Sequence, residues 1–368
     1  MFAMVRIPVK TASRNYEAVI EHGLLSRAGE ILRELLGGIQ PVFVVTVPPV
    51  RRRCGRVLLQ SLADAGFASK VVEMRDGERF KRLSSLESLA DDLVKVGADR
   101  KAVVIAFGGG VVGDVAGMLA SVYMRGVQLV QIPTTVQAQL DAAIGGKTGV
   151  NLKSGKNLLG TFYQPVLVLI DPATLSTLPD REFRAGMYEA LKCGVIGNPE
   201  LFARLEQCSI KSLRKDRDLL TWAISESVRL KAQVVSADEK ESGLRRVLNF
   251  GHTLGHALET ATSYRHFLHG EAVAWGMIGA AAIADEVRFS NNGTFDRIRD
   301  ASLSWGPLPK VSVTTSRAMT LVRSDKKTES GMVNFVLPKQ IGKVEVVNRV
   351  PETAVASALA QIRRLSRE

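Results

Sequence analysis

The first half of the chain alternates between two patterns of hydrophobic residues. Segments near 50–66, 84–96 and 114–123 have the period of a helix and separate short apolar runs that predict buried strands. Those runs are VFVVTV (42–47), KVVEM (70–74), AVVIAF (102–107), VQLVQI (127–132) and VLVLI (166–170). Because strands that alternate with helices pair in parallel, this half predicts a mostly parallel sheet with helices on both faces.

After about residue 180 the hydrophobic positions follow the period of a helix, as at Ile224 and Val228, until the strand-like run VNFVL at 333–337. The chain has 368 residues, of which 46% are apolar, and this exceeds what one hydrophobic core usually supports. We therefore predict an α/β protein with two domains, an α/β domain at 1–176 and a mainly α-helical domain at 177–368.

Cysteine usage and hydropathy indicate the compartment. Cys54, Cys193 and Cys208 are widely spaced and match neither a zinc motif nor a disulfide framework, which fits a reducing environment. The first ten residues lack the apolar core and cleavage site of an export signal. The most apolar stretches, 102–124 and 272–284, are broken by glycines or too short to cross a bilayer. We expect a cytoplasmic protein with no membrane role.

The chain is basic, with 49 lysines and arginines against 37 acidic residues and a formal charge of +12. Such a charge attracts nucleic acid, anionic surfaces and anionic small molecules alike. The densest basic run, Arg51, Arg52, Arg53 and Arg56, has no interleaved aromatic residue, and aromatics are only 6% of the chain. Because single-strand binding needs stacking platforms beside its charge, we assign this run to a solvated helix face and expect no nucleic-acid partner.

Two glycine-rich segments could bind phosphate. Glycines at 108–110 follow a predicted strand, with Gly113 and Asp114 opening the next helix, where backbone N–H groups can hold an anion. The spacing matches neither G-x-G-x-x-G nor G-x-x-x-x-G-K-[ST], so a plain tight turn stays open. The second segment carries Gly-Gly at 145–146. Its polar residues are Asp141, Lys147, Lys156 and Asn157, and a solvated loop explains its lysines equally well.

Four of the five histidines, His252, His256, His266 and His269, lie within 18 residues. His252 and His256 are four residues apart, so on a helix they share one face and could both bind a metal ion. A catalytic zinc commonly adds a carboxylate ligand. The candidates are Glu189, Glu259 and Glu271. Ordinary packing or surface histidines are the alternative.

These segments together resemble the 3-dehydroquinate synthase family of sugar-phosphate cyclases over most of the chain. The matching blocks are DGERFK (76–81), GGGVVGDVAG (108–117), YMRG (123–126), PTT (133–135), GGKTGVN (145–151), GKNLLG (155–160), TLPDRE (177–182), DEKESGLRRVLNFGHTLGHALE (238–259), HGEAV (269–273) and DKK (325–327). The resemblance implies a Rossmann-like NAD-binding domain, a helical C-terminal domain and an active site between them. It also implies bound NAD⁺, a divalent metal, zinc or alternatively cobalt, and a homodimer.

The resemblance assigns roles to single residues. The implied metal ligands are Glu189, His252 and His269, so His256 faces the substrate and the metal-binding pair inferred from spacing is replaced. The implied NAD⁺ contacts are Asp76, Gly77, Glu78, Lys81, Gly110, Gly113, Asp114, Thr134, Thr135, Lys147, Lys156, Thr174, Leu175 and Thr177. The implied catalytic and substrate contacts are Arg125, Asp141, Lys147, Asn157, Lys192, Lys231, Arg245, Asn249, His256 and either Lys326 or Lys327.

The implied reaction converts a small sugar phosphate, 3-deoxy-D-arabino-heptulosonate 7-phosphate, into 3-dehydroquinate and phosphate. It is a carbon–oxygen lyase step of the shikimate pathway. Transient oxidation by NAD⁺ makes a neighbouring proton acidic, phosphate is eliminated, the ketone is reduced again and an aldol closes the ring. The metal acts as Lewis acid and template. Basic residues suit a substrate with a carboxylate and a phosphate.

One departure and two rival functions qualify the resemblance. Ala142 and Ala143 follow Asp141 where the family usually has serines, which removes two hydroxyls near cofactor or substrate. Sister cyclases that make deoxy-inosose or valiolone-type rings share the NAD⁺ and metal sites, and a metal-dependent alcohol dehydrogenase of similar architecture would release NADH. The residues that match the dehydroquinate pattern are Lys231, Arg245, Asn249 and His256. A carboxylate-bearing substrate explains the two cations among them, so this is the function we favour.

Overall fold

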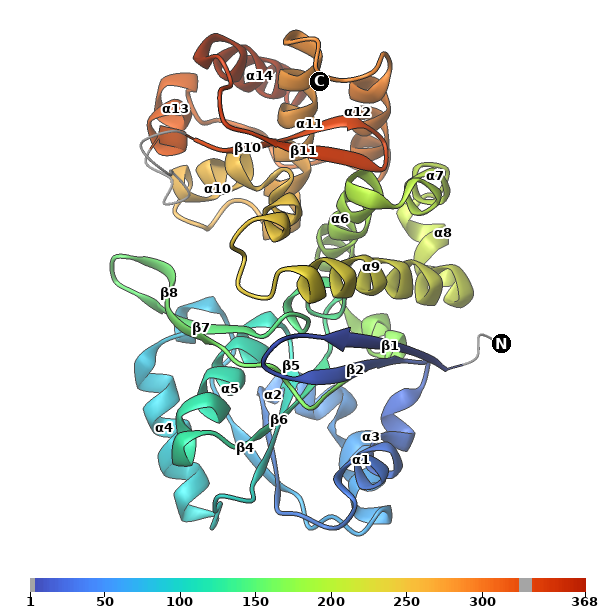
Figure 1. Cartoon of the computed structure of the whole chain (residues 1–368), viewed down its shortest axis with the longest axis vertical. Coiled ribbons are helices and arrows are strands. Elements are labelled where there is room, and N and C mark those ends of the chain that lie inside the picture. The colour runs from blue at the N-terminus through green and yellow to red at the C-terminus, as the bar shows by residue number, and fades with distance from the viewer. Residues whose placement is uncertain (1–3, 324–332) are drawn as a thin grey trace. The chain divides into compact units, whose positions relative to one another are not determined.

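The computed structural model describes residues 4–323 and 333–368, and these fall into two compact units (Figure 1). Unit 1 comprises Met1–Pro179 and Arg217–Lys240, and unit 2 comprises Asp180–Asp216 and Glu241–Glu368. The units differ from the predicted division at 176/177 in one element. The helix α9 (Arg217–Ala237) groups with unit 1, because it packs on the N-terminal hairpin and on the turn around Asp141.

Unit 1 is built on a seven-stranded sheet with the strand order β1-β2-β9-β6-β5-β3-β4. Its strands are β1 (Val5–Lys10), β2 (Asn15–Ile20), β3 (Val42–Thr46), β4 (Lys70–Glu73), β5 (Val103–Gly108), β6 (Gln128–Pro133) and β9 (Leu167–Ile170). β1 pairs antiparallel with β2, and the other neighbours pair in parallel. All five strands expected from the apolar runs are present, and the mostly parallel sheet is confirmed.

Helices cover both faces of this sheet, with α1 and α3 on one side and α4 and α5 on the other (Figure 1). These helices are α1 (Ala28–Leu36), α3 (Arg56–Asp64), α4 (Leu83–Lys95) and α5 (Gly110–Val122). Alternate residues of β3 supply the two cores, Val42 and Val44 toward one and Phe43 and Val45 toward the other. The Rossmann-like fold class is therefore confirmed.

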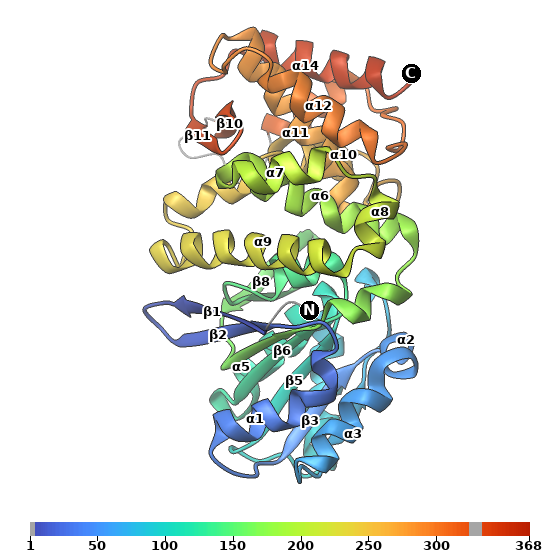
Figure 2. The same ribbon diagram turned by 90° about the vertical axis from the view of Figure 1, so that its right-hand side faces the viewer.

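Three features of unit 1 differ from the sequence expectation. The hairpin β1–β2 was not predicted, and α9 runs beside it in Figures 1 and 2, with Lys10 N donating to Ser236 Oγ at 3.0 Å. A second hairpin, β7 (Lys147–Leu152) with β8 (Gly155–Phe162), was not predicted either, and it contains two of the lysines for which a solvated loop was one of the open alternatives. Helix α5 begins at Gly110, four residues earlier than expected, because its valines pack on the sheet despite the low helix propensity of glycine.

Short helical segments connect the main elements of unit 1. They are η1 (Leu24–Arg27), α2 (Pro48–Val50), η2 (Arg51–Gly55), η3 (Glu78–Phe80), η4 (Tyr123–Arg125), η5 (Ala138–Ala142) and η6 (Pro172–Thr177). Several predicted cofactor-binding positions fall on or beside η3 and η6, namely Gly77, Glu78, Lys81, Thr174, Leu175 and Thr177. These two segments therefore decide where those side chains lie.

Unit 2 is mainly helical, as predicted. Its elements are α6 (Asp180–Gly197), α7 (Pro199–Glu206), α8 (Ile210–Lys215), η7 (Leu244–Asn249), α10 (His252–Ala261), α11 (His269–Glu286), α12 (Thr294–Ser304), α13 (Thr315–Arg323), α14 (Glu352–Leu365) and the antiparallel pair β10 (Phe335–Gln340) and β11 (Lys343–Val347). Helix α11 is buried on all sides and packs on α6, α10, α12, α14 and β10. Within residues 4–323 and 333–368, no helix has the length and apolar character needed to cross a bilayer.

Candidate active site

Three helices of unit 2 bring Glu189, His252 and His269 together. Glu189 lies in the middle of α6, while His252 and His269 are the first residues of α10 and α11. Nε2 of His269 is 3.5 Å from Glu189 Oε1, and Nε2 of His252 is 3.9 Å from the same oxygen. One possible ligand atom of each residue lies within 4.8 Å of the other two. The three side chains that the resemblance implied as metal ligands thus share one location.

Glycines allow these helices to approach closely. A Cβ on Gly270 would lie 1.7 Å from the carbonyl oxygen of Ala185, so α11 begins directly against the backbone of α6. A Cβ on Gly276 would lie 1.8 Å from the oxygen of Gly251, so α10 and α11 also meet through their backbones. Gly251 has φ of 79°, a left-handed conformation that glycine adopts without strain, immediately before the first residue of α10. The local sequence therefore fixes where both helices start.

The second nitrogen of each histidine ring faces an acceptor. Nδ1 of His252 is 3.1 Å from the carbonyl oxygen of Phe250, and Nδ1 of His269 is 3.2 Å from Oε2 of Glu259. Of the two tautomers of a neutral imidazole, an acceptor at Nδ1 favours the one that carries its hydrogen there. Both rings therefore present Nε2 to Glu189.

The charges of this cluster compensate one another. Burial favours the protonated form of Glu189, but Lys192 and His269 outweigh it and hold the pKa of the Glu189 carboxyl well below its usual range. Nζ of Lys192 is 2.5 Å from Glu189 Oε2. Burial also opposes charge on His269, but Glu189 and Glu259 together raise the pKa of His269 to about 10. Positive charge is thus favoured at the point where the imidazoles meet the carboxylate.

The donor set fits a divalent metal ion. Glu189 is 1% exposed, and its carboxylate is paired with Lys192 at Oε2, while Oε1 faces Nε2 of His252 and His269. A buried carboxylate favours nearby positive charge, and a metal ion between Oε1 and the two imidazoles would add to that of Lys192. One carboxylate and two imidazoles are ligands that zinc commonly binds, with a position left open for substrate.

Glu271, another carboxylate considered as a metal ligand, instead forms an ion pair with Arg181. It is fully buried, and Nε and Nη2 of Arg181 each donate to it at 2.7 Å. The backbone N–H of Leu268 also donates to Glu271 Oε2 at 2.9 Å, and Arg181 donates to the oxygen of His266 at 2.9 Å. This network anchors the segment directly before His269. No role was predicted for Arg181, although it lies in the matching block TLPDRE.

His256 lies beside the cluster. Its ring centroid is 5.2 Å from that of His252, in a T-shaped arrangement, and 5.9 Å from that of His269. With Glu259 and His269 it forms a second group whose possible ligand atoms lie within 4.8 Å of one another. The fourth clustered histidine, His266, is placed apart, with Nε2 2.9 Å from the oxygen of Lys310.

The turn formed by the glycines at 108–110, between β5 and α5 of unit 1, is tightly packed. A Cβ on Gly108 would lie 2.6 Å from Val112, and one on Gly109 would lie 3.1 Å from Thr135. The N–H of Thr134 donates to the oxygen of Gly108 at 2.9 Å. Gly109 precedes α5 and has no side chain with which to cap the first turn of the helix. The exposed N–H groups of such a turn are a suitable anion site.

A polar network joins several predicted site residues in unit 1. Lys81 is 4% exposed, and its ammonium donates to Asp114 and, at 2.5 Å, to Oδ1 of Asn157. Burial raises the pKa of Asp114, and the charge of Lys81 opposes that rise. Glu78 joins through Asn151, whose Nδ2 donates to Glu78 Oε1 at 2.7 Å and whose Oδ1 accepts from the N–H of Asn157 at 2.9 Å. Nζ of Lys156 is 3.5 Å from the same carboxylate. Four predicted NAD⁺ contacts therefore lie in this network, and one of them, Lys81, contacts the predicted substrate residue Asn157 directly.

Lys231 and Asp141 form a second polar contact in unit 1. Lys231 lies on α9, is 6% exposed and donates to both the backbone oxygen and Oδ1 of Asp141. This contact joins two residues that are 90 positions apart in the chain. It also ties α9 to the segment η5 of unit 1.

The other predicted residues are distributed between the units. Those in unit 1 are Asp76, Gly77, Gly110, Gly113, Arg125, Thr134, Thr135, Lys147, Thr174, Leu175 and Thr177. Those in unit 2 are Lys192, Arg245, Asn249 and His256. Nδ2 of Asn249 donates at 2.9 Å to Glu241, for which no role was predicted. Lys326 and Lys327 lie outside the described residues.

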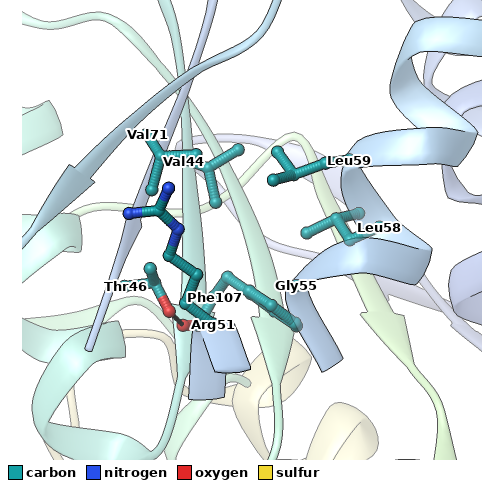
Figure 3. Close-up of a pocket in the computed structure, with 8 residues that line it drawn as sticks. All are labelled: Val44, Thr46, Arg51, Gly55, Leu58, Leu59, Val71 and Phe107. Atoms are coloured by element: carbon teal, nitrogen blue, oxygen red, sulfur yellow. Dashed lines mark hydrogen bonds between the residues drawn. The ribbon is translucent and has the colours of Figure 1, made fainter. Parts of the chain in front are cut away.

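A separate hollow in unit 1 is lined mainly by apolar side chains of β3, α3 and the strands beside β3 (Figure 3). The residues that line it are Val44, Thr46, Arg51, Gly55, Leu58, Leu59, Val71 and Phe107. Oγ1 of Thr46 donates to the oxygen of Phe107 at 2.7 Å. None of these residues belongs to the predicted site.

Comparison with known proteins identifies the family. Residues 71–185 match the sequence model of the 3-dehydroquinate synthase N-terminal family, and residues 186–328 match that of the C-terminal family. The 3-dehydroquinate synthase of Koribacter versatilis (strain Ellin345) is 52% identical over 363 residues, which cover 99% of each chain. The chain belongs to the 3-dehydroquinate synthase family.

Solved structures of sugar-phosphate cyclases share the fold. The 2-epi-5-epi-valiolone synthase from Streptomyces hygroscopicus subsp. jinggangensis, with NAD⁺ and Zn²⁺ bound, has a TM-score of 0.84 and 30% identity, over 95% of this chain and 97% of that one. A 2-deoxy-scyllo-inosose synthase in complex with carbaglucose-6-phosphate, NAD⁺ and Co²⁺ has a TM-score of 0.82 and 25% identity, over 98% and 99%. The 3-dehydroquinate synthase family is thus related in structure to cyclases with other products.

Proposed function

We propose that the chain converts 3-deoxy-D-arabino-heptulosonate 7-phosphate into 3-dehydroquinate and phosphate, the reaction after which its family is named. This reaction belongs to the shikimate pathway of aromatic amino acid biosynthesis. The observation that carries the proposal is the convergence of Glu189, His252 and His269 in a chain that is 52% identical to a 3-dehydroquinate synthase over its whole length.

NAD⁺ and a divalent metal ion, Zn²⁺ or Co²⁺, are the cofactors of this proposal. The metal would be held by Glu189, His252 and His269, whose donor atoms and burial suit it. NAD⁺ would bind unit 1, with a phosphate at the turn 108–110 and further contacts from the network around Lys81. When bound, NAD⁺ supplies hydride transfer and the metal polarises the substrate hydroxyls.

The cations of the site would orient an anionic substrate. In unit 1, Lys147 and Asn157 would contact its phosphate, and Lys231 would be held in place by Asp141. In unit 2, Arg245 is 2% exposed, and a guanidinium can bind a carboxylate through two parallel hydrogen bonds. His256 would contact the leaving phosphate. These residues supply positioning and electrostatics, because the bond-making steps occur within the substrate.

The test is a comparison of three substrates with the full-length protein. The chain, reconstituted with Zn²⁺ and NAD⁺, is given the heptulosonate phosphate, glucose 6-phosphate or sedoheptulose 7-phosphate, and phosphate release is measured. Release from the heptulosonate phosphate, together with dehydroquinate formation, is expected. Release of phosphate from one of the other two sugar phosphates instead would show that the chain has the activity of a sister cyclase. A Glu189→Gln variant is the control for contaminating phosphatases.

We expect the chain to act as a cytoplasmic homodimer. The hairpin β7–β8 supports an interface in unit 1, because it exposes Leu152, Leu158, Leu159 and Phe162, each at least 37% exposed. Clustered exposed apolar side chains of this kind commonly mark protein–protein contacts. Light scattering of the wild type and of a Leu159→Lys variant would test the expectation, with a dimer and a monomer as the respective results.

A further inference from the structure

The imidazole of His269 is held from both sides. Its Nε2 lies 3.5 Å from Glu189 Oε1, and its Nδ1 lies 3.2 Å from Glu259 Oε2. The two nitrogens of an imidazole point in different directions, so one ring contacts two carboxylates with separate tasks. Glu189 belongs to the group of three converging ligands, while Glu259 contacts the nitrogen that faces away from that group.

We propose that Glu259 is a positioning residue that fixes the tautomer and orientation of His269 for metal binding. The proposal rests on the metal site proposed above. A neutral imidazole that ligates through Nε2 carries its hydrogen on Nδ1, and that hydrogen needs an acceptor. A carboxylate acceptor also raises the basicity of the ligating nitrogen.

The fold places Glu259 for this task. Glu259 follows His252 by seven residues, so on α10 both lie on one face, two turns apart. One helix therefore supplies a ligand and the partner of the ligand on the neighbouring helix. Glu259 is 5% exposed, and a carboxylate at that depth requires a compensating contact. The backbone contact of Gly276 with Gly251 holds α11 at the distance where Glu259 reaches the ring.

The other histidine ligand shows what is particular to Glu259. Nδ1 of His252 faces the backbone oxygen of Phe250 at 3.1 Å, an arrangement that no substitution of a single side chain removes. For Nδ1 of His269 the acceptor is a side chain, the carboxylate of Glu259. Substitution of Glu259 therefore alters one ligand and leaves the other unchanged.

A competing assignment makes Glu259 a metal ligand. Its carboxylate forms a second possible group with His256 and His269. In that group His269 would ligate through the ring nitrogen nearest Glu259, yet a neutral imidazole has a single lone pair for ligation. The first group already occupies Nε2 of His269. The two assignments differ in stoichiometry, since the second adds another metal ion per chain.

The experiment measures Co²⁺ binding by the full-length protein. Metal-free wild type, Glu259→Gln and Glu259→Leu are titrated against a chromophoric chelator, and the visible absorption of bound Co²⁺ is recorded. Binding is expected to weaken about 10- to 100-fold, more for Leu than for Gln because the amide oxygen of Gln can still accept, with altered Co²⁺ bands. Glu206→Gln is the matched control, because Glu206 pairs with Arg297 in the same unit away from the cluster.

The outcomes separate this proposal from the one on which it rests. Unchanged affinity and an unchanged spectrum in both Glu259 variants, with binding lost in His252→Ala, would overturn the positioning role and keep the metal site. Unchanged binding in His252→Ala would overturn the metal site itself. Two Co²⁺ ions per wild-type chain, falling to one in Glu259→Leu, would show that Glu259 is a ligand. Folding of each variant is checked by circular dichroism.

Discussion

Gly270 and Ala185 meet so closely that a Cβ on Gly270 would lie 1.7 Å from the Ala185 carbonyl oxygen. Their contact sets the start of α11 on α6, and hence the distance between His269 and Glu189. Gly270→Ala would force the two helices apart. We expect it to destabilise the protein by about 3 kcal/mol, at the upper end of overpacking effects. Urea unfolding measures the loss of stability. A separate Co²⁺ titration of the folded variant should show weaker metal binding than in the wild type.

Gly38→Ala is the control for the glycine substitution. A Cβ at Gly38 meets nothing within 4 Å, so this variant should unfold within about 0.5 kcal/mol of the wild type. Equal stability of Gly270→Ala and Gly38→Ala would contradict the close approach of α6 and α11.

Arg181→Ala tests the anchor of the segment before His269. The substitution leaves the fully buried Glu271 without its charged partner. Since an uncompensated buried charge is costly, we expect a loss of about 3 kcal/mol of stability and weaker metal binding. Arg204→Ala is the matched control, because the exposed pair of Arg204 and Glu200 contributes about 0.5 kcal/mol or less. Similar effects of the two variants in thermal unfolding would refute the anchoring role.

The hydrophobic pattern predicted the five parallel strands because each contains a short apolar run, and β3, β5 and β9 are buried along their whole length. The pattern missed β1–β2, because Val5, Ile7 and Val9 of β1 alternate with Arg6, Pro8 and Lys10 and form no continuous apolar run. It also placed the start of α5 at Asp114, since glycines are poor helix formers and only the packing of Val112 on the sheet favours the earlier start.

The cluster of Glu189, His252 and His269 shows a second limit of prediction from sequence spacing. Spacing on a helix favoured His252 with His256, because it registers only neighbours within one element. Glu189 is 63 positions earlier in the chain, and its approach depends on backbone contacts at Gly270 and Gly276. Resemblance to the family implied the three proposed ligands, but neither route predicted the contact of Arg181 with Glu271 or that of Glu259 with His269.

The turn between β1 and β2 provides a pH-dependent contact. Burial tends to raise the pKa of Glu239, but hydrogen bonds from Ser13 and Gln164 outweigh it and lower that pKa. A lowered pKa means that this stabilisation is present above the unfolded pKa of about 4.3 and is lost as the pH falls through the folded value. Glu239→Gln should therefore cost about 0.5–1 kcal/mol at neutral pH, after solvent screening, and nothing in acid.

The measurement is the urea midpoint of wild type and Glu239→Gln between neutral and acidic pH. Glu17→Gln is the control, because Glu17 forms an exposed pair with Arg6 and should change stability little at any pH. A difference between wild type and Glu239→Gln that persists in acid would contradict the assignment.

Glu189→Gln and His269→Ala should abolish tight metal binding and turnover while the fold stays intact. Each removes one of three converging donors, and the remaining two cannot hold the ion tightly. Bound metal is measured by elemental analysis after dialysis, and the fold by circular dichroism. Full activity of metal-depleted His269→Ala would refute the site.

The most direct test of the proposed function is the balance of products from 3-deoxy-D-arabino-heptulosonate 7-phosphate. The full-length wild type is supplied with NAD⁺ and Zn²⁺, and phosphate, dehydroquinate and NADH are measured in one reaction. We predict one phosphate for each dehydroquinate, with no net NADH, because the hydride returns to the substrate. Accumulation of NADH without release of phosphate would contradict the proposal and indicate a dehydrogenase.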